Sequence, residues 1–176
     1  MTTGAGGLLS RRRDEPPDEP LGVLLLPGEL EGFELEAHVR GLLSIPRVLA
    51  LEPSHRRVPR LLRDSASMRT AARLRFPGRP RMFVLYHPAQ YPLARALCAR
   101  YAEAELWYLR PVPLALGGAR DADELDTFDE LARERAARTL GVGRGEAAPD
   151  AALRSRLREL GVIDPHAFLP GARIDK

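Results

Sequence analysis

One stretch, residues 81–92, constrains the fold of this chain more than any other. It opens with five consecutive apolar or aromatic residues, 82–86, a run too short for a helix and rich in strand-forming side chains. Pro88 ends the run, because proline donates no hydrogen bond to a sheet ladder. Pro92 then begins a helical pattern, since proline is favoured in the first turn of a helix. The stretch therefore predicts a strand buried on both faces, a loop and a helix, the unit from which parallel sheets are built.

Similar apolar runs, each bounded by glycine or proline, recur along the chain, and helical patterns separate them. The predicted strands are residues 21–26, 47–51, 82–86, 104–109, 139–143 and 167–169. Strands joined by single helices need right-handed crossovers. We therefore expect an α/β fold, a Rossmann-like three-layer α/β/α sandwich with a mostly parallel sheet of about six strands. Residues 1–20 are small, charged and proline-rich, which predicts a disordered tail, and residues 21–176 are predicted to form a single domain.

Composition and motifs exclude several classes of protein. No apolar run is long enough to span a bilayer, and the acidic segment 14–20 lacks the apolar core of a signal peptide, so we expect a cytoplasmic protein. The single cysteine, Cys98, excludes an intramolecular disulfide, and its apolar helical surroundings favour an inert thiol over a nucleophile. There is no zinc-ligand spacing, no G-x-G-x-x-G and no G-x-S-x-G. We therefore expect no metal and no cofactor.

Residues 55–81 form an arginine-rich stretch, with nine arginines against a single acid, Asp64. Such a stretch can meet phosphate groups, nucleic acid or an anionic lipid surface. The plainer interpretation is a solvated helix face, and both stay open.

Three polar residues, His87, Gln90 and Tyr91, follow the central predicted strand. Ligands of open α/β sheets bind outside the carboxyl ends of the strands, so we expect part of a ligand site here. His87 is the candidate catalytic residue, because a histidine pKa near neutral suits a general base. The alternative is a histidine that only hydrogen-bonds to its loop. Arg110, at the end of the next strand, can meet a ligand phosphate or be solvated, and His38 is expected to be structural or exposed.

Several phrases of the chain resemble the acceptor-side, amino-terminal domain of bacterial glycosyltransferases of the GT-B type, in particular those that are family 4-like. Residues 47–53, RVLALEP, resemble a phrase that follows the first helix in that group. Residues 83–97 are similar to its central strand and the helix after it. Residues 129–175 are similar to the end of the domain, where a helix ending L-x-x-L-G precedes L-P-x-G-x-D. The resemblance spans residues 21–175 and departs from the family at residues 144–149, where a serine is expected.

The resemblance implies the acceptor-side domain of a glycosyltransferase-like protein. In that family a second domain supplies most contacts to the nucleotide-sugar, so we expect this chain to be inactive alone or to depend on a separately encoded donor-binding half. Gly28 and Gly32 match glycines that approach the donor phosphates in the family, with a simple tight turn as the alternative. An anionic lipid or lipid-linked acceptor is a further implied partner, at the inner membrane face, whereas nucleic acid is not expected.

Two other functions stay open at this point. The first is a non-enzymatic interaction module that binds a protein or an anionic surface through residues 55–81. The second is a small-molecule enzyme that uses the His87 loop unaided.

Overall fold

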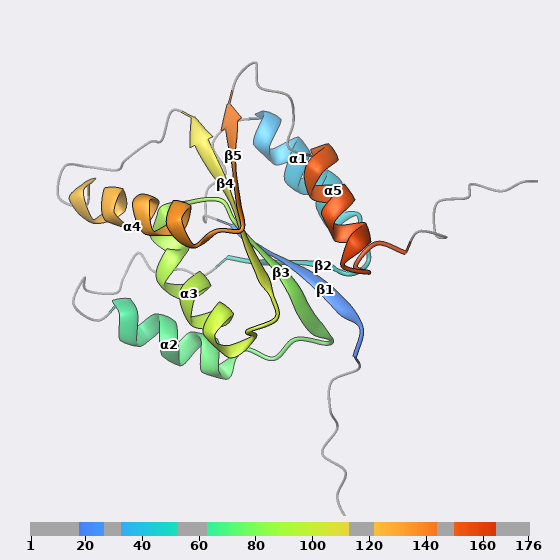
Figure 1. The fold of residues 1–176 in the computed structure, drawn as a ribbon, viewed down its shortest axis with the longest axis horizontal. Coiled ribbons are helices and arrows are strands. Elements are labelled where there is room, and N and C mark those ends of the chain that lie inside the picture. Colours follow the sequence, from blue (N-terminus) through green and yellow to red (C-terminus); the bar gives the residue numbers. More distant parts are fainter. Residues whose placement is uncertain (1–17, 27–32, 53–62, 113–121, 144–149, 165–176) are drawn as a thin grey trace, which may run out of the picture.

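Five parallel strands form one sheet in the order β2-β1-β3-β4-β5 (Figure 1). The computed structural model describes residues 18–26, 33–52, 63–112, 122–143 and 150–164. The strands are β1 (Pro20–Leu25), β2 (Val48–Leu51), β3 (Arg79–Leu85), β4 (Glu105–Val112) and β5 (Arg138–Gly143). Every neighbouring pair is parallel. The predicted α/β fold with a parallel sheet is therefore confirmed.

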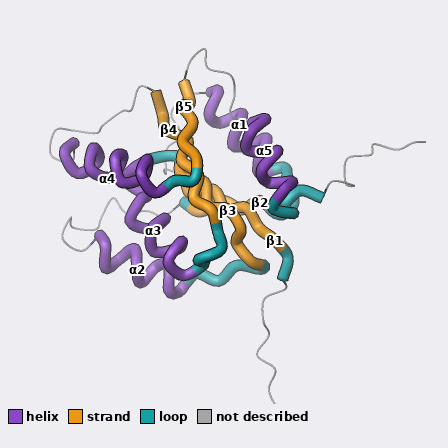
Figure 2. The backbone as a smooth tube through the Cα atoms, viewed as in Figure 1, coloured by secondary structure: helices purple, strands orange, loops and turns teal. Residues whose placement is uncertain are grey.

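Helices cover both faces of this sheet (Figure 2). In the described part of the chain they are α1 (Phe33–Leu43), α2 (Arg63–Arg73), α3 (Tyr91–Arg100), α4 (Ala122–Arg135) and α5 (Asp150–Glu159), with a 3₁₀ turn, η2 (Pro88–Gln90), before α3. One face carries α1 and α5, and the other carries α2, α3 and α4. This arrangement follows from right-handed crossovers, because the chain moves from β1 to β2 on one side and from β2 to β3 in the opposite direction.

A separate apolar cluster lies on each face of the sheet. In β1 and the residue after it, Leu24 and Leu26 pack toward α1 and α5, whereas Val23 and Leu25 pack toward α2, α3 and α4. All four side chains are almost fully buried. Burial on both faces explains why this strand appears in the sequence as a continuous apolar run rather than an alternating one.

The boundaries of β3 and β4 differ most from those that the sequence predicts, and the other strands differ by one residue at one or both ends. β3 begins at Arg79 instead of residue 82, since its first residues pair with Pro20 and Leu21 across a register shift in β1. β4 continues to Val112, a residue predicted to be in a loop. The predicted sixth strand, residues 167–169, and most of the predicted tail lie outside the described residues. β1 itself begins at Pro20, the last residue of that tail.

The order of the strands creates a switch point between β1 and β3. After β1 the chain crosses to β2 on one side of the sheet, and after β3 it crosses to β4 on the other side. The helices that follow these neighbouring strands, α1 after β1 and α3 after β3, therefore lie on opposite faces of the sheet. In open α/β sheets such a divergence forms the crevice in which ligands bind.

Candidate functional site

The carboxyl ends of β1 and β3 lie side by side at the switch point. Leu25 pairs with Leu85, and the backbone N–H of Tyr86 donates to the carbonyl of Leu25 at 3.3 Å. The loop after β3 therefore starts directly beside the loop after β1. Gly28 and Gly32, the predicted phosphate-contacting glycines, belong to that first loop and lie outside the described residues.

His87 is the first residue of the loop after β3 and caps the 3₁₀ turn η2. Its Nδ1 accepts a hydrogen bond from the backbone N–H of Ala89 at 3.2 Å, and its side chain is half-buried. A neutral imidazole whose Nδ1 accepts a hydrogen bond carries its proton at Nε2. The nitrogen that could take a proton from a substrate is therefore engaged by the loop. This contact is the one expected of a histidine that only hydrogen-bonds to its loop, and the role of His87 as a base stays a prediction.

Gln90 connects the two loops of the switch point. Only 4% of its surface is exposed, and its Nε2 donates a hydrogen bond to the backbone carbonyl of Leu26. Its other polar atom, Oε1, is buried and finds no hydrogen-bond partner within the described part of the chain. Exchanging the amide nitrogen and oxygen of Gln90 does not satisfy both atoms, because Oε1 would then face the carbonyl oxygen of Leu26. An unpaired buried acceptor costs about 1–3 kcal/mol, so this atom calls for a donor.

Tyr91 packs between helices. It is 3% exposed, and its ring contacts that of Phe128 in α4 with 6.2 Å between the ring centres. Burial raises the pKa of its hydroxyl, and the arginines that act against this shift are Arg135 and Arg95. Arg135 is the last residue of α4, near the amino end of β5. The hydroxyl of Tyr91 is therefore influenced by a charge that lies away from the switch point.

Arg110, near the carboxyl end of β4, is bound to a buried acid of α4. Its Nε lies 2.9 Å and 3.1 Å from the two carboxylate oxygens of Asp129, which also accepts a hydrogen bond from the hydroxyl of Tyr108 at 2.7 Å. Burial alone would raise the pKa of Asp129, but the hydrogen bonds from Arg110 and Tyr108 outweigh burial and keep that pKa below its usual value. The pKa of Arg110 is raised in turn, chiefly by its hydrogen bond to Asp129.

Sequence reasoning missed Asp129, although a signal for it existed. In α4 the residue occupies the stripe of Leu125, Phe128 and Ala132, which faces the sheet. An acid in an apolar helical stripe needs a buried partner. The alternation of Tyr108 and Arg110 on one face of the neighbouring strand supplies it.

His38 and Tyr86 form a second buried pair that the sequence did not bring together. His38 lies in α1 and Tyr86 follows β3, and His38 Nε2 is 3.0 Å from the Tyr86 hydroxyl. Both residues are buried, on the face of the sheet covered by α1 and α5. Of the two predicted roles for His38, structural or exposed, the structure supports the first.

Cys98 lies in α3 as a half-buried free thiol. Burial raises the pKa of this thiol to about 11, so little of it is thiolate at neutral pH. The prediction of an inert cysteine is consistent with this environment.

A groove of about 480 Å³ lies at the opposite end of the sheet, beside the first residues of β4 and β5 and the last turns of α5. Its charged side chains already contact one another or the protein. Arg156 is paired with Glu105 and with Glu159, and the guanidinium of Arg138 lies 5.5 Å from the ring centre of Trp107. The groove therefore lies away from the switch point, at the other end of the strands.

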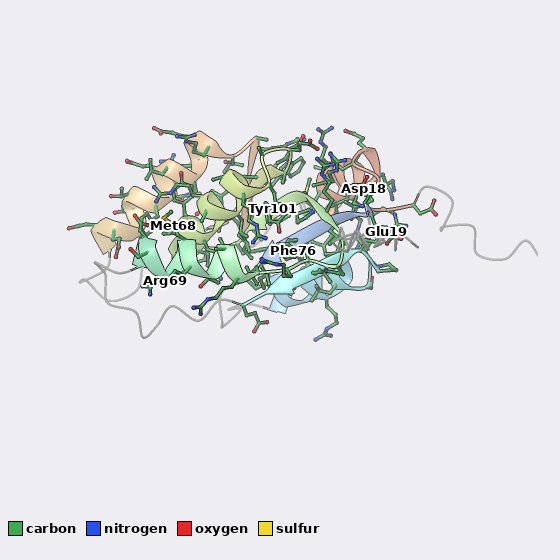
Figure 3. All side chains as sticks on the ribbon, turned by 90° about the horizontal axis from the view of Figure 1, so that it is seen from below. Asp18, Glu19, Met68, Arg69, Phe76 and Tyr101 are labelled. Atoms are coloured by element: carbon green, nitrogen blue, oxygen red, sulfur yellow. The ribbon has the colours of Figure 1, made fainter. Side chains whose placement is uncertain are left out.

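The described part of the arginine-rich stretch is largely engaged within the protein. Arg79 and Arg81 form ion pairs with Glu103 at 2.6 Å and 2.7 Å. In α2, Met68 is 64% exposed, and the next residue, Arg69, is exposed as well (Figure 3). Binding of an anionic surface stays a prediction, and the earlier arginines of the stretch lie outside the described residues.

Within the described ranges, no group of three or more His, Cys, Asp or Glu side chains is arranged to hold a metal ion. No helix in these ranges is long and apolar enough to cross a membrane.

No family model, no curated protein and no solved structure matches the chain. The resemblance to glycosyltransferases therefore rests on the sequence phrases alone.

Proposed function

We propose that this chain is the acceptor-side domain of a glycosyl-transferring protein and that it binds the acceptor at the carboxyl ends of β1 and β3. The observation that carries the proposal is the buried Oε1 of Gln90, which has no hydrogen-bond partner among the described residues. This atom needs a hydrogen-bond donor. A sugar or another polyhydroxylated molecule offers several O–H donors, whereas a sulfate ion or a phosphate diester offers none.

The contacts of Gln90 suit it to orient a ligand. Its amide nitrogen is fixed by the carbonyl of Leu26, so the position of Oε1 is set before a ligand arrives. A group that is already in place loses little conformational entropy on binding, which favours a defined pose of the bound hydroxyl. His87 is three residues away, and its candidate role as a base requires release of its hydrogen bond to Ala89.

The proposal assigns the nucleotide-sugar to a second domain, carried by the same polypeptide or by another. It takes this division from the resemblance, in which the donor-binding half supplies the contacts to the diphosphate. A lipid-linked acceptor would place the assembled protein at the cytoplasmic face of the inner membrane.

Chemical-shift mapping of the isotope-labelled chain with glucose as the probe tests this function. We expect shifts at Leu26 and at residues 86–90, and Gln90→Leu should weaken binding about tenfold or more, because a buried hydrogen bond is lost. Ser155→Ala, in the groove at the other end of the sheet, is the matched control and should bind as the unmodified chain does. Shifts clustered at the amino ends of the strands would contradict the proposal, as would the absence of shifts.

A further inference from the structure

Arg110 lies at the same edge of the sheet as Gln90. Leu85 of β3 pairs with Tyr108 of β4, so Arg110, two residues further, is level with His87 on the neighbouring strand. The turn η2, which contains Gln90, packs against α4, and α4 carries the acid that binds Arg110. Arg110 and the turn η2 are therefore both placed against α4, at the same edge of the sheet.

The ion pair with Asp129 uses only one edge of this guanidinium. Nε is the atom that contacts both carboxylate oxygens. An arginine has five N–H donors, and the other four are on the terminal nitrogens Nη1 and Nη2. Within the described ranges, these two nitrogens make no hydrogen bond or ion pair, and the side chain of Arg110 is 35% exposed. The terminal fork is therefore held in place by Asp129 and remains available to a ligand.

The two arginines of this cluster outnumber the one carboxylate that they share. Asp129 is shared by two arginines, Arg110 and Arg133, the second at 3.4 Å, so one carboxylate faces two positive charges. The other acid that acts on Arg110 is Asp126, which is exposed to solvent and therefore screened. A planar guanidinium fork matches the oxygens of a phosphate or a carboxylate.

We propose that one ligand contacts both residues: its hydroxyl donates a hydrogen bond to Gln90 Oε1, and its anionic group binds Arg110. Such a ligand is a hydroxylated anion, for example a sugar phosphate or a sugar acid. This inference rests on the proposed function, because it places both groups of the ligand in the same crevice. It assigns Asp129 the role of a positioning residue, which orients the arginine without touching the ligand.

Binding of three probes, glucose, glucose 6-phosphate and glucuronate, measured by the same shift mapping at low salt tests this inference. We expect the two anions to bind about tenfold or more tightly than glucose, because charge-assisted hydrogen bonds are stronger than neutral ones. Arg110→Gln should remove this preference, so that glucose and the two anions bind this variant with similar affinity. The matched control, Arg133→Gln, removes the other arginine from the same carboxylate and should keep the preference. A preference for glucose 6-phosphate alone identifies a phosphate site, and a preference for both anions identifies a general anion site.

Equal affinity of the unmodified chain for glucose and the anions would overturn the inference while leaving the proposed function intact. Equal losses in Arg110→Gln and Arg133→Gln would overturn it too, because they would show a structural effect through Asp129. Binding of the anions without glucose would support Arg110 and contradict the role of Gln90. Should Arg110→Gln fail to fold, Arg110→Lys keeps the charge but loses the fork, and a reduced preference in that variant is the expected result.

Discussion

The backbone segments that lead into β1 and β3 are in close contact at Gly78. At Gly78, directly before β3, an added Cβ would collide with the backbone carbonyl oxygen of Glu19 and approach Leu21 Cγ to 3.0 Å. The same carbonyl accepts a hydrogen bond from the N–H of Arg79 at 2.8 Å. The chain needs glycine here because of this approach, without any need for an unusual backbone angle.

Gly78→Ala should therefore lower the free energy of unfolding by about 1–3 kcal/mol, since the two backbone segments must move apart. Gly41→Ala is the matched control in α1, where the new Cβ would meet the flexible end of Arg154 at 3.2 Å. Alanine favours a helix over glycine by about 1 kcal/mol, so this variant should be as stable as the unmodified chain or more stable. Urea unfolding of both variants measures the difference. Equal stability of Gly78→Ala and the unmodified chain would contradict the close contact.

At the scale of the element, the pairing of β4 with α4 depends on a buried ionised acid. Asp129 is 4% exposed, and its pKa lies below the usual 3.8 because the hydrogen bonds from Arg110 and Tyr108 outweigh the effect of burial. A carboxyl group whose pKa is lower in the folded state stabilises the fold above its unfolded pKa. This contribution is lost as the pH falls through the folded pKa.

We expect the unfolding free energy of the unmodified chain to fall as the pH drops below about 3.8, the usual value of an aspartate. In Asp129→Asn this dependence on pH should be weaker. It should not vanish, because the hydrogen bond from Arg156 also lowers the pKa of Glu105. Asp123→Asn, on the exposed side of the same helix, should keep the full dependence. Denaturant unfolding at several acidic pH values measures the slopes, and identical slopes for Asp129→Asn and the unmodified chain would exclude the proposed contribution.

Elements could be predicted from the sequence where burial alone determines them. The apolar runs located all five described strands. In β1 and β3 the cause is burial on both faces, which requires an apolar side chain at almost every position, whereas the edge strands β2 and β5 are only partly buried. The first residues of β3 escaped prediction since Arg79 and Arg81 are polar. Arg79 pairs with Pro20, Arg81 lies at the register shift, and both form ion pairs with Glu103. Strand order is a tertiary property that no local pattern encodes.

In the candidate site, too, some features could be predicted from the sequence and others depend on tertiary packing. The loop after β3 was expected beside the end of β1, and Gln90 contacts Leu26 there, whereas ligand binding by this loop stays a prediction. The surroundings of Tyr91 and the partner of Arg110 depend on how α4 packs, and the sequence does not reveal this packing. Which polar atom is left unpaired depends on a contact between residues that lie far apart in sequence, such as Gln90 and Leu26.

At the scale of the whole molecule, one sheet separates two apolar clusters, and each central strand contributes residues to both. Neighbouring residues of β3 belong to different clusters, Val84 to one and Phe83 to the other. The proposed binding groups, Gln90 and Arg110, lie at one edge of this sheet. In the proposed function this edge would orient an acceptor, but transfer of a sugar also requires stabilisation of the leaving diphosphate.

The 176-residue chain alone is therefore expected to bind an acceptor without transferring sugar to it. Preorganised charges and N–H donors around the leaving group usually contribute most of the rate enhancement in such a reaction. At the described edge of the switch point, Gln90 supplies an acceptor oxygen, and the arginine nearest to it in register, Arg110, is partly neutralised by Asp129. Incubation of the purified chain with glucose 6-phosphate and a panel of nucleotide-sugars, followed by measurement of released nucleoside diphosphate, provides the check, with protein-free mixtures as the control. Release above that background, abolished by Gln90→Leu, would show instead that this chain carries a complete active site in which the crevice binds the acceptor.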